Sequence, residues 1–407
     1  MTKIQTTDFL MIGGGVLGLT LALEIKRRRP SSQITLIEKE DQIAFHASGR
    51  NSGVLHAGFY YTADSLKARF TREGCKRWKQ YCKDKNLKIN ECGKLVVAKN
   101  VSELDGLVEL LRRAKLNHVE LHEISESEAK KIEPRVKTHQ RALYSPTTAS
   151  VDPKEVMNAV FQDAKTAGVQ ILTSTAYLSK TKEGVLTSQG EIKANYIINA
   201  AGLYADKIAQ DFGFSTNYRI LPFKGLYLYS DETPGSIKTN IYPVPDLNNP
   251  FLGVHYTITA QGKIKIGPTA IPALWREHYQ GFENFNWEEF TEVVGREADL
   301  FLRNSFGFRN LAFQEIPKYF RSRMVTLASE LLTGVEKKNY KKWGPPGIRA
   351  QLLNIKTRKL EMDFKFEGDK HSFHVLNAVS PAFTCAMPFS EYLFDQMEKL
   401  THGSTPH

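Results

Sequence analysis

The feature that most constrains the fold is a glycine-rich turn near the start of the chain, Gly13-Gly14-Gly15-Val16-Leu17-Gly18. An apolar run at residues 8–12 precedes it, as expected of a buried parallel strand. Apolar side chains at helical spacing follow it, and a second apolar run at residues 34–38 ends in Glu38. This order predicts a strand, turn, helix and strand unit that opens an α/β fold.

The spacing within this unit suits the phosphates and the ribose of a dinucleotide. Gly13 permits a tight turn, Gly15 lets the backbone approach a pyrophosphate, and Gly18 lets the helix pack closely on the strand. Glu38 follows Gly18 by twenty residues, and a carboxylate there accepts both ribose hydroxyls and repels a 2′-phosphate. The alternative is a glycine-rich turn in an ordinary α/β protein. The context favours a dinucleotide, with FAD and NAD both open at this point.

A polar, glycine-rich stretch at residues 46–61 lies just beyond Glu38. A nicotinamide-binding unit would normally begin a helix here. Gly, Ser and Asn instead offer hydroxyls and N–H groups to a ligand that lies along the backbone. A flexible surface loop is the alternative, but the bulky apolar residues of the stretch disfavour it.

Two shorter motifs occur further along the chain. Small residues at positions 199–202 let the chain pass close to a bound cofactor at the end of a strand. In residues 377–384, Ser380 or Pro381 opens a helix whose N–H groups can face the electron-rich pyrimidine end of a reduced flavin. A plain surface helix with an N-cap is the alternative for this second motif.

Patterning along the rest of the chain indicates two architectures. We expect helices at residues 102–132, 153–167 and 287–339, strands at 171–178, 196–199 and 374–377, and a closing helix. Between residues 216 and 270, strands broken by Pro and Gly favour an antiparallel sheet.

A length of 407 residues predicts a chain that folds into two domains. Because it contains no run of 18 apolar residues and no signal peptide at its start, we expect a cytoplasmic protein. The four cysteines lack CxxC pairing and zinc-ligand spacing, so we expect reduced structural thiols and no metal.

The net charge of +11 suits an anionic substrate. Its basic clusters, at residues 26–29 and 337–342, are solvated faces or surfaces for anionic headgroups or nucleic acid. No nucleic-acid motif accompanies them, so we expect no nucleic-acid partner. Peripheral contact with the inner face of the cell membrane stays open, since many flavin dehydrogenases pass electrons to a membrane quinone.

The four motifs together, in this order, resemble the D-amino-acid oxidase superfamily of FAD enzymes. Within it, the chain resembles the L-2-hydroxyglutarate dehydrogenase/oxidase family. The blocks that carry this resemblance are spread along the chain, at residues 51–61, 199–203, 221–228, 241–246, 251–257, 267–270, 347–351 and 377–382. Two positions depart from the family pattern: Leu226 stands where an acidic residue is usual, which could alter substrate choice, and Pro388 interrupts the closing helix.

The resemblance implies an α/β fold with a Rossmann-like FAD-binding domain of the D-amino-acid oxidase type. A second, substrate-binding domain would combine an antiparallel sheet with helices. The implied FAD-binding segments are 1–90, 140–215 and 345–407, and the implied substrate-binding segments are 91–139 and 216–344.

The implied reaction is oxidation of L-2-hydroxyglutarate to 2-oxoglutarate, with hydride transfer from C2 to flavin N5 and with quinone or oxygen as the final acceptor. A histidine would take the hydroxyl proton, and His56 and His255 are both candidates. Either could instead hydrogen-bond the flavin or its loop. Cations and tyrosines would bind the dicarboxylate, and a structural ion pair is the alternative for the arginines. The implied substrate-binding residues are Tyr60, Lys224, Tyr242, Tyr256, Arg276 and Arg349.

The FAD contacts implied by the motifs and the resemblance are Gly13, Gly15, Val16, Leu17, Gly18, Glu38, Lys39, Ser48, Arg50, Asn51, Ser52, Gly53, Val54, Tyr177, Ala201, Gly202, Ser380, Pro381, Ala382 and Thr384. Another hydroxy acid, an amino acid or glycerol 3-phosphate is the alternative substrate within the same superfamily. A nucleotide-binding scaffold without turnover is the alternative of another class.

Overall fold

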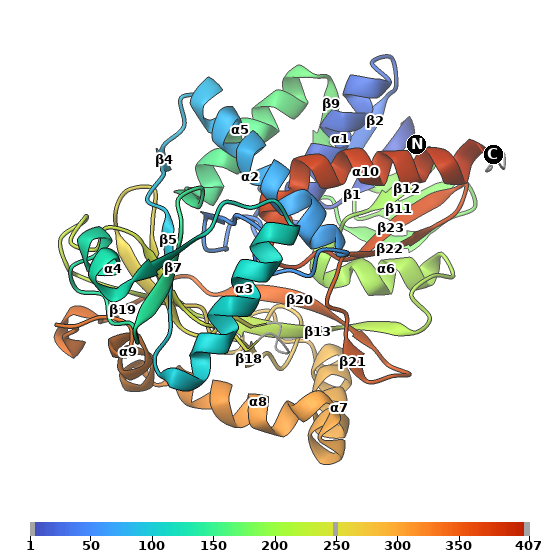
Figure 1. Ribbon diagram of the computed structural model, residues 1–407. Coiled ribbons are helices and arrows are strands. Elements are labelled where there is room, and N and C mark those ends of the chain that lie inside the picture. The colour runs from blue at the N-terminus through green and yellow to red at the C-terminus, as the bar shows by residue number, and fades with distance from the viewer. Residues whose placement is uncertain (1–4, 247–250, 403–407) are drawn as a thin grey trace. The chain divides into compact units, whose positions relative to one another are not determined.

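The computed structural model describes residues 5–246 and 251–402 (Figure 1). The chain divides into two compact units. Unit 1 comprises Met1–Arg50, Lys154–Pro222 and Arg349–His407, and unit 2 comprises Asn51–Pro153 and Phe223–Ile348. Strands β13 (Tyr218–Gly225) and β20 (Gly347–Asn354) carry the chain from one unit to the other.

Unit 1 is built on a parallel sheet in which β1 (Gln5–Ile12) lies between β12 (Gly190–Asn199) and β2 (Ile34–Ile37). The last four residues of β1 are all buried, as expected of a parallel strand covered on both faces. Further parallel strands pair with β2 and with β12, and an antiparallel hairpin extends β12. These strands are β9 (Val169–Leu172), β23 (Ser372–Asn377), β10 (Tyr177–Lys180) and β11 (Gly184–Thr187).

Helices α1 (Val16–Arg28) and α10 (Ala382–His402) pack side by side in unit 1 (Figure 1). A buried hydrogen bond of 2.8 Å joins the Thr20 and Ser390 hydroxyls between them. Lys26, Arg27 and Arg28 occupy the last turn of α1, where cations offset the negative end of the helix dipole. The other elements of unit 1 are α5 (Pro153–Thr166), η2 (Gly202–Tyr204), α6 (Ala205–Asp211), β21 (Lys359–Leu360) and β22 (Lys365–Gly368).

Unit 2 is built on an eight-stranded sheet with the order β19-β14-β17-β16-β15-β5-β7-β6. Its neighbouring strands are antiparallel, apart from the parallel pair β5 and β15. The strands are β5 (Lys94–Val97), β6 (His122–Ser125), β7 (Arg141–Ser145), β14 (Leu228–Tyr229), β15 (Asn240–Pro243), β16 (His255–Ile258), β17 (Ile264–Gly267) and β19 (Lys342–Trp343).

The two faces of this sheet are covered by different helices. One face forms an apolar core with α9 (Arg321–Ser329), and the other packs partly on α3 (Leu104–Leu116). The other helices of unit 2 are α2 (Leu66–Asp84), η1 (Val101–Glu103), α4 (Glu126–Ile132), α7 (Trp287–Arg303), η3 (Ser305–Gly307), α8 (Phe308–Glu315), η4 (Ile316–Tyr319) and η5 (Lys337–Asn339). Its short strands are β3 (Val54–Leu55), β4 (Ile89–Asn90), β8 (Ala149–Val151) and β18 (Ile271–Pro272).

Most of the predicted elements are confirmed, and two are wrong in extent. The helix predicted at residues 102–132 is broken, because α3 ends at Leu116 and β6 precedes α4. A capping box between Ser125 and Glu128 starts α4 afresh. The strand predicted at residues 171–178 is also two strands, since Ser174 adopts a left-handed φ of 50° between them.

The compact units do not coincide with the predicted segments. Residues 51–90, which the resemblance assigns to FAD binding, belong to unit 2, because β3 and β4 both pair with β8 there. The ends of the predicted outer segments, residues 1–4 and 403–407, lie outside the described residues. Which segments bind FAD and which bind substrate stays a prediction.

No helix in the described part of the chain has both the length and the apolar character needed to cross a membrane. The four cysteines, all within the described residues, form no disulfide. Burial raises the pKa of the Cys75 thiol to about 11, which keeps that thiol protonated at neutral pH.

Candidate active site

The turn between β1 and α1 has the geometry that its glycines require. Gly13 adopts a φ of +111°, and a Cβ there would lie 2.7 Å from the Ala200 carbonyl oxygen. A Cβ on Gly18 would lie 1.9 Å from the carbonyl oxygen of Gly13. Larger residues therefore cannot replace these glycines without moving the backbone. The turn thus needs glycine for the two reasons predicted from the sequence, a tight turn at Gly13 and close packing of the helix on the strand at Gly18.

The carboxylate of Glu38 is fixed at the end of β2. It accepts the Gly14 N–H at 2.8 Å and the Glu40 N–H at 3.0 Å. An ionised carboxylate has about four lone-pair sites, so these two bonds leave capacity for ribose hydroxyls. The position and chemistry of this buried group fit the adenosine end of a dinucleotide.

The start of α1 suits a phosphate. The first turn contains no acidic residue, and its N-cap, Gly15, makes no side-chain capping bond. The Val16 N–H donates to the Ser48 hydroxyl at 2.9 Å, and a Cβ on Gly15 would lie 3.1 Å from that oxygen. This arrangement brings Gly15, Val16 and Ser48 together at the positive end of the helix, with Leu17 and Gly18 in the first turn.

Three other predicted FAD contacts of unit 1 already have partners within the chain. Lys39 forms an ion pair with Glu40. The Nε of Arg50 donates to the Phe45 carbonyl at 2.8 Å. The Tyr177 hydroxyl donates to Asp211 at 2.9 Å, and burial together with this bond raises the tyrosine's pKa. Their roles in binding FAD stay predictions.

The two remaining motifs of unit 1 follow the carboxyl ends of parallel strands. Ala201 and Gly202 follow β12, and a Cβ on Gly202 would have no neighbour within 4 Å among the described residues. Ser380 and Pro381 follow β23 and precede α10, which begins at Ala382 and contains Thr384. Both motifs therefore follow strands of the sheet that contains β1, where ligands of such sheets bind.

The predicted FAD contacts of unit 2 form a side-chain-supported turn before β3. The Gly53 N–H donates to the Asn51 side chain at 2.8 Å, and the Val54 N–H donates to the Ser52 hydroxyl at 3.2 Å. Gly53 has a φ of +78°, and a Cβ there would lie 2.3 Å from the Val151 carbonyl. His56, one of the two predicted bases, is buried just beyond β3.

The second predicted base, His255, lies on a polar face of the unit 2 sheet. Its ring stacks on Tyr242 of the neighbouring strand, with centroids 3.6 Å apart and planes 18° apart. Its Nδ1 lies 2.9 Å from the Gly253 carbonyl oxygen. Because a carbonyl only accepts, Nδ1 carries the proton, and Nε2 is then the basic nitrogen of the neutral ring.

The structure does not bring Tyr256 together with Tyr242 and His255. Successive residues of a strand point to opposite faces, so Tyr256 lies on the face that packs on α9. Its ring belongs to the apolar core there, and burial beside Tyr340 raises the pKa of its hydroxyl. The period of the strand thus separates two tyrosines that the sequence analysis grouped together.

The predicted cations occupy different surroundings. Lys224 of β13 is buried, which lowers its pKa to about 8. Arg276 is also buried, and its guanidinium lies 3.9 Å from the Glu292 carboxylate, a contact consistent with a structural ion pair. Arg349 of β20 belongs to unit 1 and is half-buried. Tyr60 packs in the core cluster that also contains Tyr242.

Sequence reasoning missed two buried lysines on the same face as His255. Lys94 begins β5, and Lys265 lies on β17. Burial lowers the pKa of Lys94 to about 7 and that of Lys265 to about 8. The signal that could have found Lys94 is a lysine at the head of an otherwise apolar strand, Lys94-Leu-Val-Val97.

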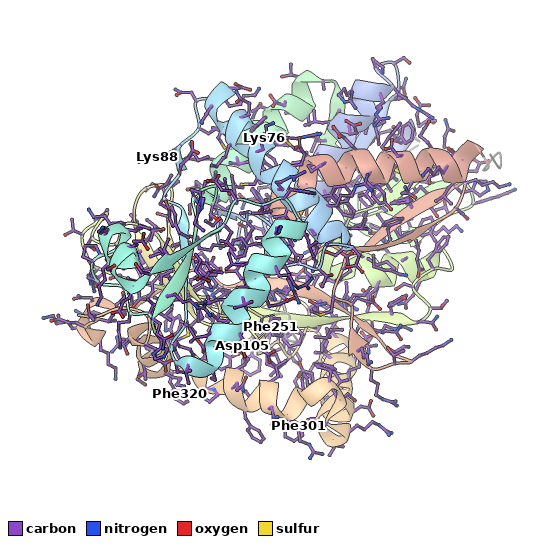
Figure 2. The ribbon with its side chains drawn as sticks, in the orientation of Figure 1. Lys76, Lys88, Asp105, Phe251, Phe301 and Phe320 are labelled. Atoms are coloured by element: carbon purple, nitrogen blue, oxygen red, sulfur yellow. The ribbon has the colours of Figure 1, made fainter. Side chains whose placement is uncertain are left out.

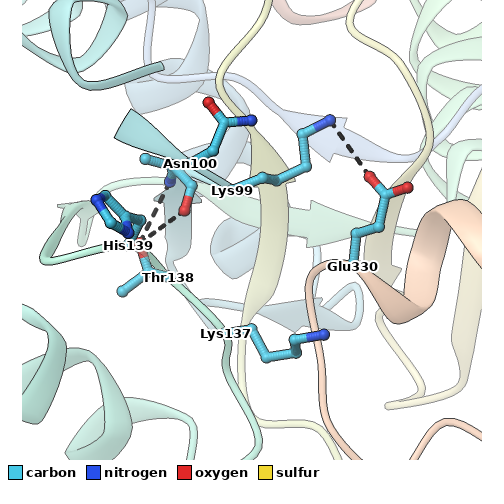
Figure 3. A pocket seen from close by; sticks show the side chains of 7 residues that line it. Lys99, Asn100, Lys137, Thr138, His139 and Glu330 are labelled. Carbon is cyan, nitrogen blue, oxygen red and sulfur yellow. Dashed lines mark hydrogen bonds and ion pairs between the residues drawn. The ribbon is translucent and has the colours of Figure 1, made fainter. Parts of the chain in front are cut away.

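A pocket of about 400 Å³ in unit 2 lies elsewhere (Figure 3). Two of its lining residues form an ion pair, in which the Lys99 Nζ lies 3.3 Å from a carboxylate oxygen of Glu330. None of the predicted site residues is among those that line it, which are Ala98, Lys99, Asn100, Lys137, Thr138, His139 and Glu330.

Comparisons with known proteins agree with the geometry of the cofactor site. The family model described as FAD dependent oxidoreductase matches residues 8–392. The mitochondrial L-2-hydroxyglutarate dehydrogenase of Bos taurus is 34% identical over 96% of this chain and 89% of its own length. The L-2-hydroxyglutarate dehydrogenase of Escherichia coli strain UMN026 is 32% identical over 97% of this chain and 93% of its own length.

A solved structure shares the fold. The L-alpha-glycerophosphate oxidase of Mycoplasma pneumoniae, with FAD bound, superimposes with a TM-score of 0.75 over 98% of this chain and 96% of that one, at 21% identity. The predicted fold class and the predicted cofactor, FAD, are thereby confirmed. The chain belongs to the FAD-dependent oxidoreductases of the D-amino-acid oxidase type and, within them, to the L-2-hydroxyglutarate dehydrogenase family.

Proposed function

We propose that this enzyme oxidises L-2-hydroxyglutarate to 2-oxoglutarate. The similarity to L-2-hydroxyglutarate dehydrogenases along nearly the whole chain supports the choice of substrate. The observation that carries the chemistry is a buried histidine, His255, whose ring is oriented by the Gly253 carbonyl so that Nε2 is basic.

Oxidation of the alcohol removes a hydride from C2 and a proton from the hydroxyl. Bound FAD supplies the hydride acceptor. His255 takes the proton on Nε2, while Nδ1 keeps its bond to Gly253 and stacking on Tyr242 holds the ring plane. His56 is the alternative base, since it is also buried and follows the turn at Asn51.

The carboxylates require cations. Lys224 and Arg349 are the stronger candidates, because both lie in sequence blocks that carry the family resemblance and Lys224 is buried. Arg276 is the weaker candidate, since Glu292 lies beside its guanidinium. Leu226 follows Gly225 in the same block and keeps that position apolar, where the family usually has an acidic residue.

A quinone or oxygen is the final electron acceptor. Exposed aromatic rings on helices α7 to α9 of unit 2 favour a peripheral membrane surface and hence a quinone (Figure 2). Phe313 is 67% exposed and Phe320 is 69% exposed, and Arg303 and Arg309 lie in the same segment. The expected location is then the inner face of the cell membrane, with a cytoplasmic protein as the alternative.

Flotation with anionic vesicles tests this surface. We expect the holoenzyme to float with the vesicles and the variant Phe313→Ala/Phe320→Ala to float much less. Equal flotation of both proteins, or none by the wild type, would remove the membrane proposal without touching the substrate assignment.

Anaerobic reduction of the flavin tests the proposed activity. The yellow holoenzyme is mixed with L-2-hydroxyglutarate, L-lactate, glycerol 3-phosphate, glycine and L-proline in turn, and the loss of visible absorbance is followed. We expect L-2-hydroxyglutarate to bleach the flavin fastest. Preference for an amine or for glycerol 3-phosphate would contradict the proposal.

A further inference from the structure

Lys94 combines burial with the lack of a hydrogen-bond partner. Its side chain is fully buried, and its Nζ makes no hydrogen bond with any residue that the structure describes. The titratable groups that act on it are the thiols of Cys75 from α2 and Cys92 before β5, both of which burial keeps protonated. No carboxylate of the described residues thus compensates this ammonium.

The surroundings of Lys94 are aromatic. Its Nζ lies 4.2 Å from the centroid of Tyr242, 5.1 Å from that of Tyr60 and 5.5 Å from that of Phe59. Cation–π contacts recover only part of the hydration that burial removes. The Tyr60 hydroxyl in this cluster also lacks a hydrogen-bond partner among the described residues. Unpaired polar groups that gather in one buried cluster indicate a binding site for an anion with acceptor oxygens.

The sheet register connects this cluster to His255. Asn240 pairs with Lys94 on one side of β15, and Ile241 pairs with Tyr256 on the other side. Lys94, Tyr242 and His255 therefore share one face, with Tyr242 on the central strand of the three. The Tyr242 ring accordingly separates the imidazole from the ammonium. A ligand that reaches both groups must span this ring.

We propose that Lys94 binds the remote carboxylate of the substrate and so selects a five-carbon dicarboxylate over 2-hydroxy acids with a single carboxylate. The inference rests on the proposed function. In L-2-hydroxyglutarate two methylene groups separate C2 from the remote carboxylate, so the hydroxyl lies at His255 while the remote charge reaches past Tyr242. The flexible four-carbon stem of lysine lets the ammonium turn toward that charge.

Paired substrates test this role. L-2-hydroxypentanoate has the same C2 centre as L-2-hydroxyglutarate but ends in a methyl group. In Lys94→Met we expect kcat/KM for L-2-hydroxyglutarate to fall about 100-fold, mainly through KM, because a buried charge pair is lost. The kcat/KM for L-2-hydroxypentanoate should stay within a few-fold of wild type. An equal loss with both substrates would show a merely structural lysine and overturn the proposal.

Lys265→Met is the matched control. Lys265 is buried on the same face and lies 4.4 Å from the Tyr227 ring, but Asp152 acts on it electrostatically. Its loss should leave the ratio of the two kcat/KM values unchanged. The same change of ratio in both variants would overturn the specific assignment to Lys94.

Equilibrium binding distinguishes a failure of the Lys94 inference from a failure of the proposed function. Glutarate has both carboxylates and no hydroxyl to oxidise, so its dissociation constant is measured on the oxidised holoenzyme from the change in flavin absorbance. We expect Lys94→Met to weaken glutarate about 100-fold and pentanoate hardly at all. If the wild type oxidises L-2-hydroxyglutarate and the variant binds glutarate normally, the Lys94 inference fails alone. If the wild type neither oxidises L-2-hydroxyglutarate nor binds glutarate, the proposed function fails, and the inference that rests on it fails too.

The pH dependence of glutarate binding to the wild-type enzyme tests the proposal even if the Lys94→Met variant does not fold. Glutarate should bind about tenfold more weakly for each pH unit above the pKa of Lys94 in the free enzyme, about 7, and below its pKa in the complex, because only the ammonium pairs with the carboxylate. An affinity that stays constant from about pH 6 to about pH 10 would overturn the proposal.

Discussion

His255 is held by its own strand segment. The Gly253 carbonyl accepts from Nδ1 at 2.9 Å, and Gly253 itself adopts a φ of +73°, which turns the chain just before β16. Tyr242 supports the ring plane by stacking. Because a hydrogen bond fixes one ring nitrogen and stacking fixes the ring plane, the imidazole needs little reorganisation when it accepts the proton.

The variant His255→Asn tests this base. The asparagine amide can still donate to Gly253 but offers no nitrogen lone pair, so we expect kcat to fall about 10²- to 10⁴-fold with FAD content unchanged. Rapid anaerobic flavin reduction measures the effect. Tyr256→Phe, on the opposite face, should change the same rate much less. A large loss in Tyr256→Phe with little in His255→Asn would reverse the assignment.

Lys94 also has a consequence for stability. Its pKa is lowered to about 7 in the folded protein from an ordinary 10.5, so between these values the unfolded chain binds more protons. This lysine therefore makes stability rise with pH across that window, and its penalty is largest below pH 7.

We expect Lys94→Met, without substrate, to raise Tm relative to wild type more at about pH 6 than at about pH 9, since methionine removes the buried charge. Thermal unfolding at both pH values measures the difference. A difference in Tm that does not change with pH would contradict the burial of an unpaired ammonium.

At the scale of elements, the turn between β1 and α1 has no room for additional atoms. A Cβ on Gly18 would meet the Gly13 carbonyl oxygen at 1.9 Å, so Gly18→Ala must move α1 away from β1. We expect the purified variant to lose most of its FAD, as measured by absorbance of the protein and of the released cofactor.

Gly295→Ala is the matched control for this substitution. Gly295 is exposed in α7, and a Cβ there would have no neighbour within 4 Å among the described residues. The alanine should keep its FAD and gain about 0.5–1 kcal/mol of stability, because glycine is unfavourable inside a helix. Normal FAD content in Gly18→Ala would show that the turn does not limit cofactor binding.

The strand, turn and helix at the start of the chain could be predicted well, because residues close together in the sequence determine their geometry. Gly13, Gly18 and Glu38 act through spacing along one strand, turn and helix, and the structure places them as that spacing requires. The substrate side depends on register between distant strands, which spacing does not encode. Hence Tyr256 was grouped with Tyr242, and Lys94 was passed over as the first residue of an apolar strand.

At the scale of the whole molecule, the chain alternates between its two units. Unit 1 is assembled from three separate segments, and unit 2 from the two segments between them. The candidate cofactor residues divide at Arg50 and Asn51, where the chain passes from one unit to the other. The glycine turn and the polar face with His255 therefore belong to different units, as expected of an enzyme that binds cofactor and substrate with different parts of its chain.

Stereochemical titration of the flavin tests the central claim most directly. The FAD-loaded enzyme is titrated anaerobically with L-2-hydroxyglutarate and, separately, with its D isomer, while reduced flavin and 2-oxoglutarate are both measured. We expect the L isomer to yield one 2-oxoglutarate for each flavin reduced, and the D isomer to leave the flavin oxidised. Equal reduction by both isomers, or reduced flavin without 2-oxoglutarate, would contradict the account.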